Sequence, residues 1–313
     1  MSGQHYLLSI DAGGTKTVAL LAGQAGDVLG RGTAGAANLH AGGHAAAEAA
    51  LAEAADAACA AAGVTPAAIG GLCIGLAGVD RPHERAHFQA WAAARFPGAV
   101  VAIANDAELV LAAGTPAGWG VALICGTGSI VYGRSADGHL ARAGGWGHLL
   151  GDEGSGYAIG LAGLRAILRA YDGRTPPTAL TAPVLGHWQL ASPTDLLHRV
   201  YQAHASKAEI AALAPLVLAA AADGDAAARH ILEEAAEELA LAVAAVAQRL
   251  AVTGALPCAV AGGVMLGSPQ LQAQFGDAAR RRGLTLAPVA YVAEPVYGAL
   301  RLAQLAVVQH SQA

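Results

Sequence analysis

The chain has 313 residues, a formal net charge of −5 and few aromatic side chains, so alanine, valine and leucine supply most of its apolar bulk. No basic block or stripe occurs, which argues against a nucleic-acid partner, and no uninterrupted apolar run is long enough to span a membrane. The first residues lack the pattern of a signal peptide, and the four cysteines lie far apart, so we expect a soluble cytoplasmic protein with reduced thiols.

The first predicted element is a β-hairpin over residues 6–30, where two apolar strands flank a glycine-rich turn that carries hydroxyl groups. A similar unit, GVALICGTGSIVYGRSADGH, spans residues 120–139. The repetition indicates a duplicated chain in which one hairpin opens each half.

Helices and strands alternate after each hairpin. Between the hairpins the pattern predicts helices over 43–62 and 82–96 and apolar strands over 69–76 and 100–104, the last buried on both faces. After the second hairpin it predicts, in order, a helix over 155–171, a proline-rich loop or small insertion over 172–193, a helix over 226–251, a strand over 255–261 and a final helix from Val296. This alternation is typical of an α/β architecture.

A cluster of turn residues, Gly114, Pro116 and Gly118, marks the expected domain boundary. We expect a first domain over residues 1–115 and a second over 116–313. The last helix, near 296–309, is expected to pack back on the first domain.

The turn of the first hairpin reads Asp11-Ala12-Gly13-Gly14-Thr15-Lys16-Thr17. Glycines let the backbone approach a ligand, and the amides of such a turn can cradle phosphate oxygens. A carboxylate beside phosphates suits Mg²⁺, which keeps several waters and takes few protein oxygens. A plain hairpin turn is the alternative interpretation.

The second hairpin has the turn Gly126-Thr127-Gly128-Ser129, and a third glycine pair, Gly262-Gly263, follows a strand. Neither a P-loop nor a complete dinucleotide fingerprint occurs. The pairing of two such turns in two halves nevertheless predicts that they grip one triphosphate from both sides, with the third glycine pair lying against a base or ribose.

The motifs DAGGTKT, GTGS and AGGV, in this order, resemble the phosphate and adenosine motifs of the sugar kinase/Hsp70/actin ATPase superfamily. The segments GLAGVDRP (75–82), ANDAELV (104–110), CGTGS (125–129) and GGWGHLLGDEGSGYAIG (144–160) more closely resemble the BadF/BadG/BcrA/BcrD-type family, in particular its N-acetylglucosamine and glucosamine kinases. The resemblance implies an α/β fold of two ribonuclease-H-like, actin-like ATPase domains, with ATP and sugar in the cleft between them.

The resemblance also implies roles for individual residues. Asp106 would be the base that takes the proton from the sugar hydroxyl, although it could instead cap the following helix. Asp11 would hold Mg²⁺ through water. The implied sugar contacts are Asn38, Gly78, Asp80, Asp106, Gly145 and Asp152, while Glu153 and Ser155 would start a helix. The implied ATP contacts are Gly13, Gly14, Thr15, Lys16, Gly126, Thr127, Gly128, Ser129, Gly262 and Gly263.

These features predict an ATP- and Mg²⁺-dependent kinase that phosphorylates N-acetylglucosamine or glucosamine, most readily at O6, and acts as a homodimer. An alternative is an ATPase that works with a protein partner, as in the activator branch of the family, but close-set cysteines that would ligate a cluster are absent from the sequence. A remote alternative is a zinc peptidase, because His83-Glu84-Arg85-Ala86-His87 matches H-E-x-x-H and Glu108 follows it. In such enzymes the third ligand comes from a following helix, but here Pro97-Gly98 and a strand intervene, which weakens this alternative.

Overall fold

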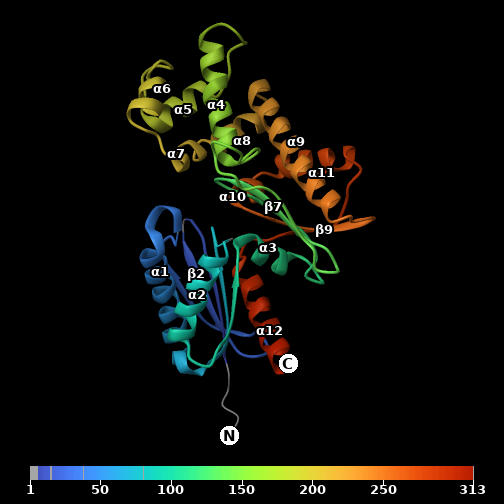
Figure 1. The fold of residues 1–313 in the computed structure, drawn as a ribbon. Helices are drawn as coiled ribbons and strands as arrows, with labels where there is room; N and C mark the ends of the chain where they lie inside the picture. Colours follow the sequence, from blue (N-terminus) through green and yellow to red (C-terminus); the bar gives the residue numbers. More distant parts are fainter. Residues whose placement is uncertain (1–5, 15, 38, 80, 313) are drawn as a thin grey trace. The chain divides into compact units, whose positions relative to one another are not determined.

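The computed structural model describes residues 6–14, 16–37, 39–79 and 81–312. The chain forms two compact units, Met1–Gly118 with Glu294–Ala313, and Trp119–Ala293 (Figure 1). The last helix, α12 (Val296–Gln312), belongs to the first unit because it packs against β1, β4 and α3 of that unit. The second unit therefore ends at Ala293, before the end of the 116–313 segment expected from the sequence.

The first unit contains a five-stranded sheet with the order β3-β2-β1-β4-β5. Its strands are β1 (Tyr6–Ala12), β2 (Thr17–Ala22), β3 (Val28–Ala34), β4 (Ile69–Leu76) and β5 (Val100–Ala104). β1, β2 and β3 form an antiparallel meander, whereas β1, β4 and β5 run parallel. Both faces of β5 pack against core side chains, as expected, Val101 and Ile103 on one face and Ala102 and Ala104 on the other, but four of its five residues are only half-buried.

Helices pack on both faces of this sheet. α1 (Leu39–Ala62) and α2 (Pro82–Arg95) bury their apolar side chains with one face of β1 and β4, in a core that includes Phe88. α3 (Asp106–Gly114) and α12 pack together on the other face, where Leu109 meets Ala299 and Ala303. A short 3₁₀ turn, Pro66–Ala68, precedes β4.

The second unit repeats this architecture. Its sheet has the order β10-β9-β6-β7-β8, which read from β8 is the order of the first sheet. Its strands are β6 (Gly120–Cys125), β7 (Ser129–Arg134), β8 (Leu140–Gly144), β9 (Ala255–Ala261) and β10 (Thr285–Tyr291). As in the first sheet, three strands, β6, β7 and β8, form an antiparallel meander, and β9 and β10 continue the sheet from β6 as parallel strands. The α/β fold with an internal duplication is thus confirmed.

Most helices of the second unit lie between β8 and β9. These are α4 (Gly156–Tyr171), α5 (Thr181–Trp188), α6 (Asp195–Leu197), the π-turn His198–Gln202, α7 (Lys207–Ala211), α8 (Ala214–Ala222) and α9 (Ala226–Arg249). Two further helices, α10 (Gly263–Leu266) and α11 (Pro269–Arg281), lie between β9 and β10. The segment 172–193 is not only loop, because it contains α5, which buries Val184 in the main core.

In the described part of the chain no single helix is long and apolar enough to cross a membrane; by length and composition alone, the bent pair Lys207–Ala222 and Ala226–Arg249 could do so together.

Candidate functional site

The carboxyl ends of β1, β4 and β5 meet at one edge of the first sheet, because these strands are parallel. Asp11 lies near the end of β1, Gly78 follows β4, and Asp106 follows β5. The turn after β1 is closed by a hydrogen bond from the Gly13 amide to the Lys16 carbonyl (3.0 Å). The Ala37 amide donates to the Gly13 carbonyl (3.1 Å), so the segment before α1 is held against this turn.

Asp11 and Asp106 interact electrostatically at this edge. Burial, and next the negative charge of Asp106, raise the pKa of Asp11 to about 6, while Lys16 acts in the opposite direction. Two carboxylates that disfavour each other's charge fit a site that receives a cation. Among the described residues no group of three or more histidine, cysteine, aspartate or glutamate side chains could hold a metal. A pair of carboxylates is the type of protein ligand that suits an ion such as Mg²⁺, which takes one or two carboxylates and completes its shell with water and phosphate.

Asp106 is the first residue of α3, and its neighbour Asn105 is the N-cap. The Glu108 amide donates to Asn105 Oδ1 (2.8 Å), and the Asn105 amide donates to Glu108 Oε2 (2.8 Å), which completes a capping box. Asn105 and not Asp106 is therefore the N-cap of the helix, although Asp106 Oδ1 also accepts the Ala107 amide of the first turn (3.0 Å). The helix amino terminus favours a negative charge at Asp106.

Arg85 of α2 anchors the same segment from outside the motif. Its guanidinium donates to Glu108 (3.1 Å) and to the Ile103 carbonyl of β5 (2.6 Å). The sequence predicted neither this support nor the cap, because both depend on contacts between elements distant in the chain.

In the second unit, the turn of residues 126–129 connects β6 and β7 and is fixed to the start of α4. The Gly156 amide donates to the Gly126 carbonyl (2.8 Å), and the Tyr157 amide donates to the Thr127 carbonyl (3.2 Å). Ser155 caps α4, as expected, by accepting the Ala158 amide (3.2 Å). These bonds hold the turn in one conformation before any ligand binds.

The glycine pair after β9 lies directly beside this turn. Gly262 has a φ of +98°, and a Cβ at this position would lie 2.3 Å from the Cys125 carbonyl oxygen. Only glycine can therefore bring the chain this close to the end of β6. Gly263 starts α10, and its amide would lie 3.8 Å from a Cβ built on Gly126.

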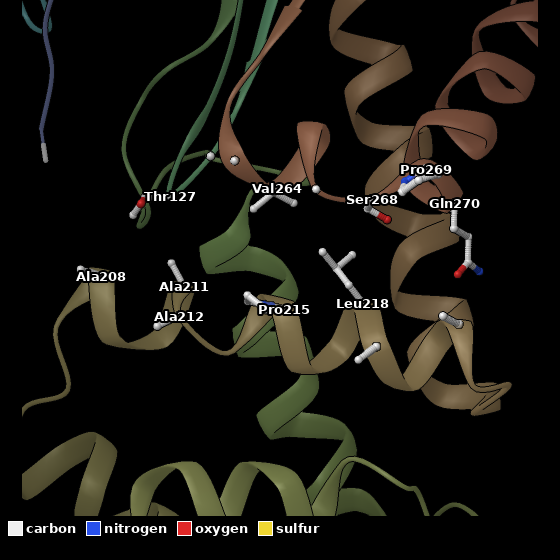
Figure 2. Close-up of a pocket in the computed structure, with 15 residues that line it drawn as sticks. Thr127, Ala208, Ala211, Ala212, Pro215, Leu218, Val264, Ser268, Pro269 and Gln270 are labelled. Atoms are coloured by element: carbon white, nitrogen blue, oxygen red, sulfur yellow. The ribbon is translucent and has the colours of Figure 1, made fainter. Parts of the chain in front are cut away.

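A cavity of about 830 Å³ opens between these two turns and helices α7 and α8 (Figure 2). Thr127 lies at one end and Gln270 at the other, and Val264 faces Pro215 and Leu218 across the cavity. The lining residues are Gly126, Thr127, Ala208, Ala211, Ala212, Pro215, Leu218, Ala219, Ala222, Gly263, Val264, Gly267, Ser268, Pro269 and Gln270. The largely apolar wall suits a flat base, and the glycine turn at one end suits a polar group attached to it. The α7–α8 wall was missed from the sequence, because its alanines carry no motif.

Asp152 contacts the turn of residues 126–129. It is buried and has a φ of +60°. Its Oδ1 accepts a hydrogen bond from the Ser129 amide (3.1 Å). Its Oδ2 forms an ion pair with Lys207 Nζ at 2.7 Å, but the angles of this contact are not those of a hydrogen bond. The Ser129 hydroxyl donates to the Glu153 carbonyl (2.7 Å), and the Gly145 amide donates to the Ser129 carbonyl (3.1 Å).

Three expected contact residues, Thr15, Asn38 and Asp80, lie outside the described residues. Gly14, Lys16 and Thr127 are exposed in their turns.

The H-E-x-x-H motif lies on α2, but its side chains serve contacts with α1. His87 bonds Glu48 of α1 (2.6 Å), and Glu84 pairs with His44 of α1 and with His83 (3.3 Å). As none of the described acids and histidines forms a three-ligand group, this geometry gives the zinc interpretation no support.

Comparison with known proteins identifies the family. The model of the BadF/BadG/BcrA/BcrD ATPase family matches residues 8–303, so the chain belongs to that family. An N-acetylmuramic acid/N-acetylglucosamine kinase of Clostridium acetobutylicum is 36% identical over 247 residues, which cover 79% of this chain and 81% of the relative. An N-acetyl-D-glucosamine kinase of Dictyostelium discoideum is 35% identical over 246 residues, 75% of this chain and 77% of the relative.

Solved structures agree with the fold. A Chromobacterium violaceum structure assigned as an N-acetylglucosamine kinase is 29% identical, covers 97% of this chain and 99% of its own, and has a TM-score of 0.75. A ROK family glucokinase from Streptomyces griseus, in complex with glucose and AMPPNP, shares the fold at 19% identity, with a TM-score of 0.58, and covers 96% of this chain and 98% of its own. The actin-like ATPase fold of sugar kinases is thus confirmed for this chain.

Proposed function

We propose that this BadF/BadG/BcrA/BcrD family member is an ATP-dependent hexosamine kinase that phosphorylates N-acetylglucosamine or glucosamine at O6. The observation that carries the proposal is the carboxylate pair Asp11 and Asp106 at one sheet edge, with the cap of α3 supplied by Asn105. The two kinases that share more than a third of their aligned residues with this chain support the substrate class.

Asp106 is the proposed base. An ionised carboxylate at the start of α3 orients the sugar hydroxyl by accepting its hydrogen bond and takes its proton as the phosphoryl group is transferred. Asp11, whose charge burial and Asp106 disfavour, is the proposed holder of Mg²⁺ through water, and the ion would offset the charge of the phosphate oxygens.

The cavity of the second unit is the proposed adenosine site. The base would lie against the wall formed by Pro215, Leu218 and Val264. Thr127, at one end of the cavity, lies in the turn proposed for the phosphates. Turn amides and hydroxyls position the phosphoryl group, and no covalent intermediate is required. Gly78 and Gly145, with Asn38 and Asp80, are the proposed sugar contacts. We also propose a cytoplasmic homodimer, which light scattering of the purified protein tests.

A protein-activating ATPase is the competing function. The activator chemistry needs accessible cysteines at a subunit interface, yet all four cysteines here are buried. Burial raises the pKa of Cys125 and Cys258 to about 12, which keeps both thiols protonated and unreactive.

The test is a coupled ADP-release assay with Mg-ATP and a sugar panel: N-acetylglucosamine, glucosamine, N-acetylmuramic acid, N-acetylmannosamine, glucose, 6-deoxy-N-acetylglucosamine and no sugar. We expect release that depends on an aminosugar and is absent with the 6-deoxy compound. Phosphorus–proton NMR of the product should place the phosphate at O6. Equal release in every well would favour the partner-dependent ATPase, and a product phosphorylated at O1 would refute the regiochemistry.

A further inference from the structure

The chain uses lysine at only two positions. It has 16 arginines, whereas its lysines are Lys16 and Lys207. Lys16 lies in the turn after β1, and Lys207 is the first residue of α7. Because arginine supplies the positive charge elsewhere, a lysine at position 207 suggests a place that needs a compact ammonium rather than a planar guanidinium.

The Lys207 ammonium lies beside Asp152 and Gly128. Its Nζ lies 2.7 Å from Asp152 Oδ2. A Cβ built on Gly128 would lie 3.0 Å from Lys207 Nζ and 2.8 Å from Asp152 Oδ1, so the ammonium and the carboxylate both lie directly against the Gly128 backbone. A side chain larger than glycine at position 128 would therefore displace this pair.

Asp152 is built to hold this position. Its side chain is 5% exposed, and its φ of +60° is a conformation that costs a non-glycine residue about 1 kcal/mol. One oxygen binds the Ser129 amide and the other pairs with Lys207, so the carboxylate connects the turn to α7. These two partners do not use all the acceptor positions of the carboxylate, so the sugar contact implied for Asp152 is compatible with them.

Lys207 also adjoins the cavity. Ala208, the next residue, lines the cavity together with Gly126 and Thr127 (Figure 2). About a third of the Lys207 side chain is exposed (34%), so Asp152 and the turn do not fully enclose it. The Gly126 amide donates a hydrogen bond to the Gly128 carbonyl, and the Ser129 amide donates to Asp152. These two amides already have partners within the protein and are not free donors for a phosphate.

We propose that Lys207 binds a phosphate oxygen of a nucleoside polyphosphate at the turn of residues 126–129, and that Asp152 is the positioning residue that holds its ammonium there. This inference rests on the proposed function only in requiring that a nucleotide occupies the cavity. The ammonium would add a point charge to a turn that otherwise offers only backbone and hydroxyl dipoles.

Binding measurements separate this role from a structural one. Calorimetry should show that Lys207→Met weakens ADP binding about tenfold or more, while binding of adenosine, which has no phosphate, is unchanged. Asp152→Asn should act in the same direction. The matched control is Arg199→Met, because Arg199 lies on the neighbouring turn and pairs with Glu209 of α7 instead of the phosphate turn. Urea denaturation of each variant identifies folding defects.

The lysine count offers a second readout that does not depend on a variant's fold. Reductive methylation with isotope-labelled formaldehyde should label the two lysines and the terminal amine, and Lys207→Arg identifies the Lys207 signal in the NMR spectrum. ADP should shift this signal and adenosine should leave it in place. Equal ADP affinity of wild type and Lys207→Met, or a Lys207 signal that ADP does not move, would overturn the inference and leave the kinase proposal intact. Failure of the wild-type protein to bind any adenine nucleotide would overturn both.

Discussion

Replacing Asp11 with asparagine should stabilise the ligand-free protein by about 3 kcal/mol above neutral pH. In the folded chain the pKa of Asp11 is about 6, against an ordinary value of 3.8, because burial and Asp106 disfavour the carboxylate. A pKa that is raised in the folded state contributes its full stability below the ordinary pKa of 3.8. This contribution to the free energy of unfolding is lost as the pH rises through the folded-state pKa of about 6. A shift of roughly two units corresponds to about 3 kcal/mol, which asparagine does not lose because it does not ionise.

Urea denaturation without nucleotide or Mg²⁺ measures this difference. The gain in unfolding free energy from Asp11→Asn should be about 3 kcal/mol near pH 8 and about half as large near pH 5. Asp106→Asn in the same background removes the second cause of the shift, so the effect of Asp11→Asn should become smaller. Glu53→Gln, on the exposed face of α1, is the control and should change little at either pH. A gain that is independent of pH, or a loss of stability near pH 8, would refute this account of Asp11.

Three further substitutions test the site. Asp106→Asn should lower kcat by roughly 100-fold to 10,000-fold while calorimetry shows ADP binding retained, and unchanged turnover would remove Asp106 from the mechanism. Gly262→Ala should destabilise the protein by about 2 kcal/mol or more in chemical denaturation, because its Cβ would meet the Cys125 carbonyl at 2.3 Å and its φ is positive; wild-type stability would show that the contact relaxes freely. Leu218→Trp should fill the cavity and raise KM for ATP about tenfold with little change in Tm, whereas an unaltered KM would place the nucleotide elsewhere.

The sequence predicted correctly the strands that consist mainly of apolar side chains. The strands over 69–76, 100–104 and 255–261 were located to the residue, since each is an apolar run bounded by turn residues. β3 was missed because its buried positions are Gly30 and Gly32, where a Cβ would lie 2.2 Å and 2.0 Å from carbonyl oxygens of α1. Helix packing there requires glycine, and glycine removes the apolar periodicity that would have predicted the strand.

The same distinction holds for the site. The positions of Asp11, Asp106 and the glycine turns at strand ends could be predicted because each belongs to a short motif that follows an apolar run, whereas their roles stay a prediction. Lys207 could not be found that way. Locally it stands between Ser206 and Glu209, which form a capping box, and this pattern predicts a helix start and nothing more. Its partner Asp152 is distant in the chain, so only the scarcity of lysine in the composition signalled a special position.

The two units carry their lysines on different elements, a turn in the first unit and a helix in the second. In the first unit the paired residues Ala12 and Thr17 leave four residues in the turn, the last of which is Lys16, close enough to Asp11 to lower its pKa. In the second unit Cys125 pairs directly with Ser129, which leaves three residues in the turn, and none of them is a lysine. Lys207 brings an ammonium to this shorter turn from α7, and Asp152 holds it there as Asp11 accompanies Lys16. Each unit thus combines a glycine turn, an ammonium and a carboxylate, which are the groups that the proposed phosphate contacts use, although the two units supply them from different elements.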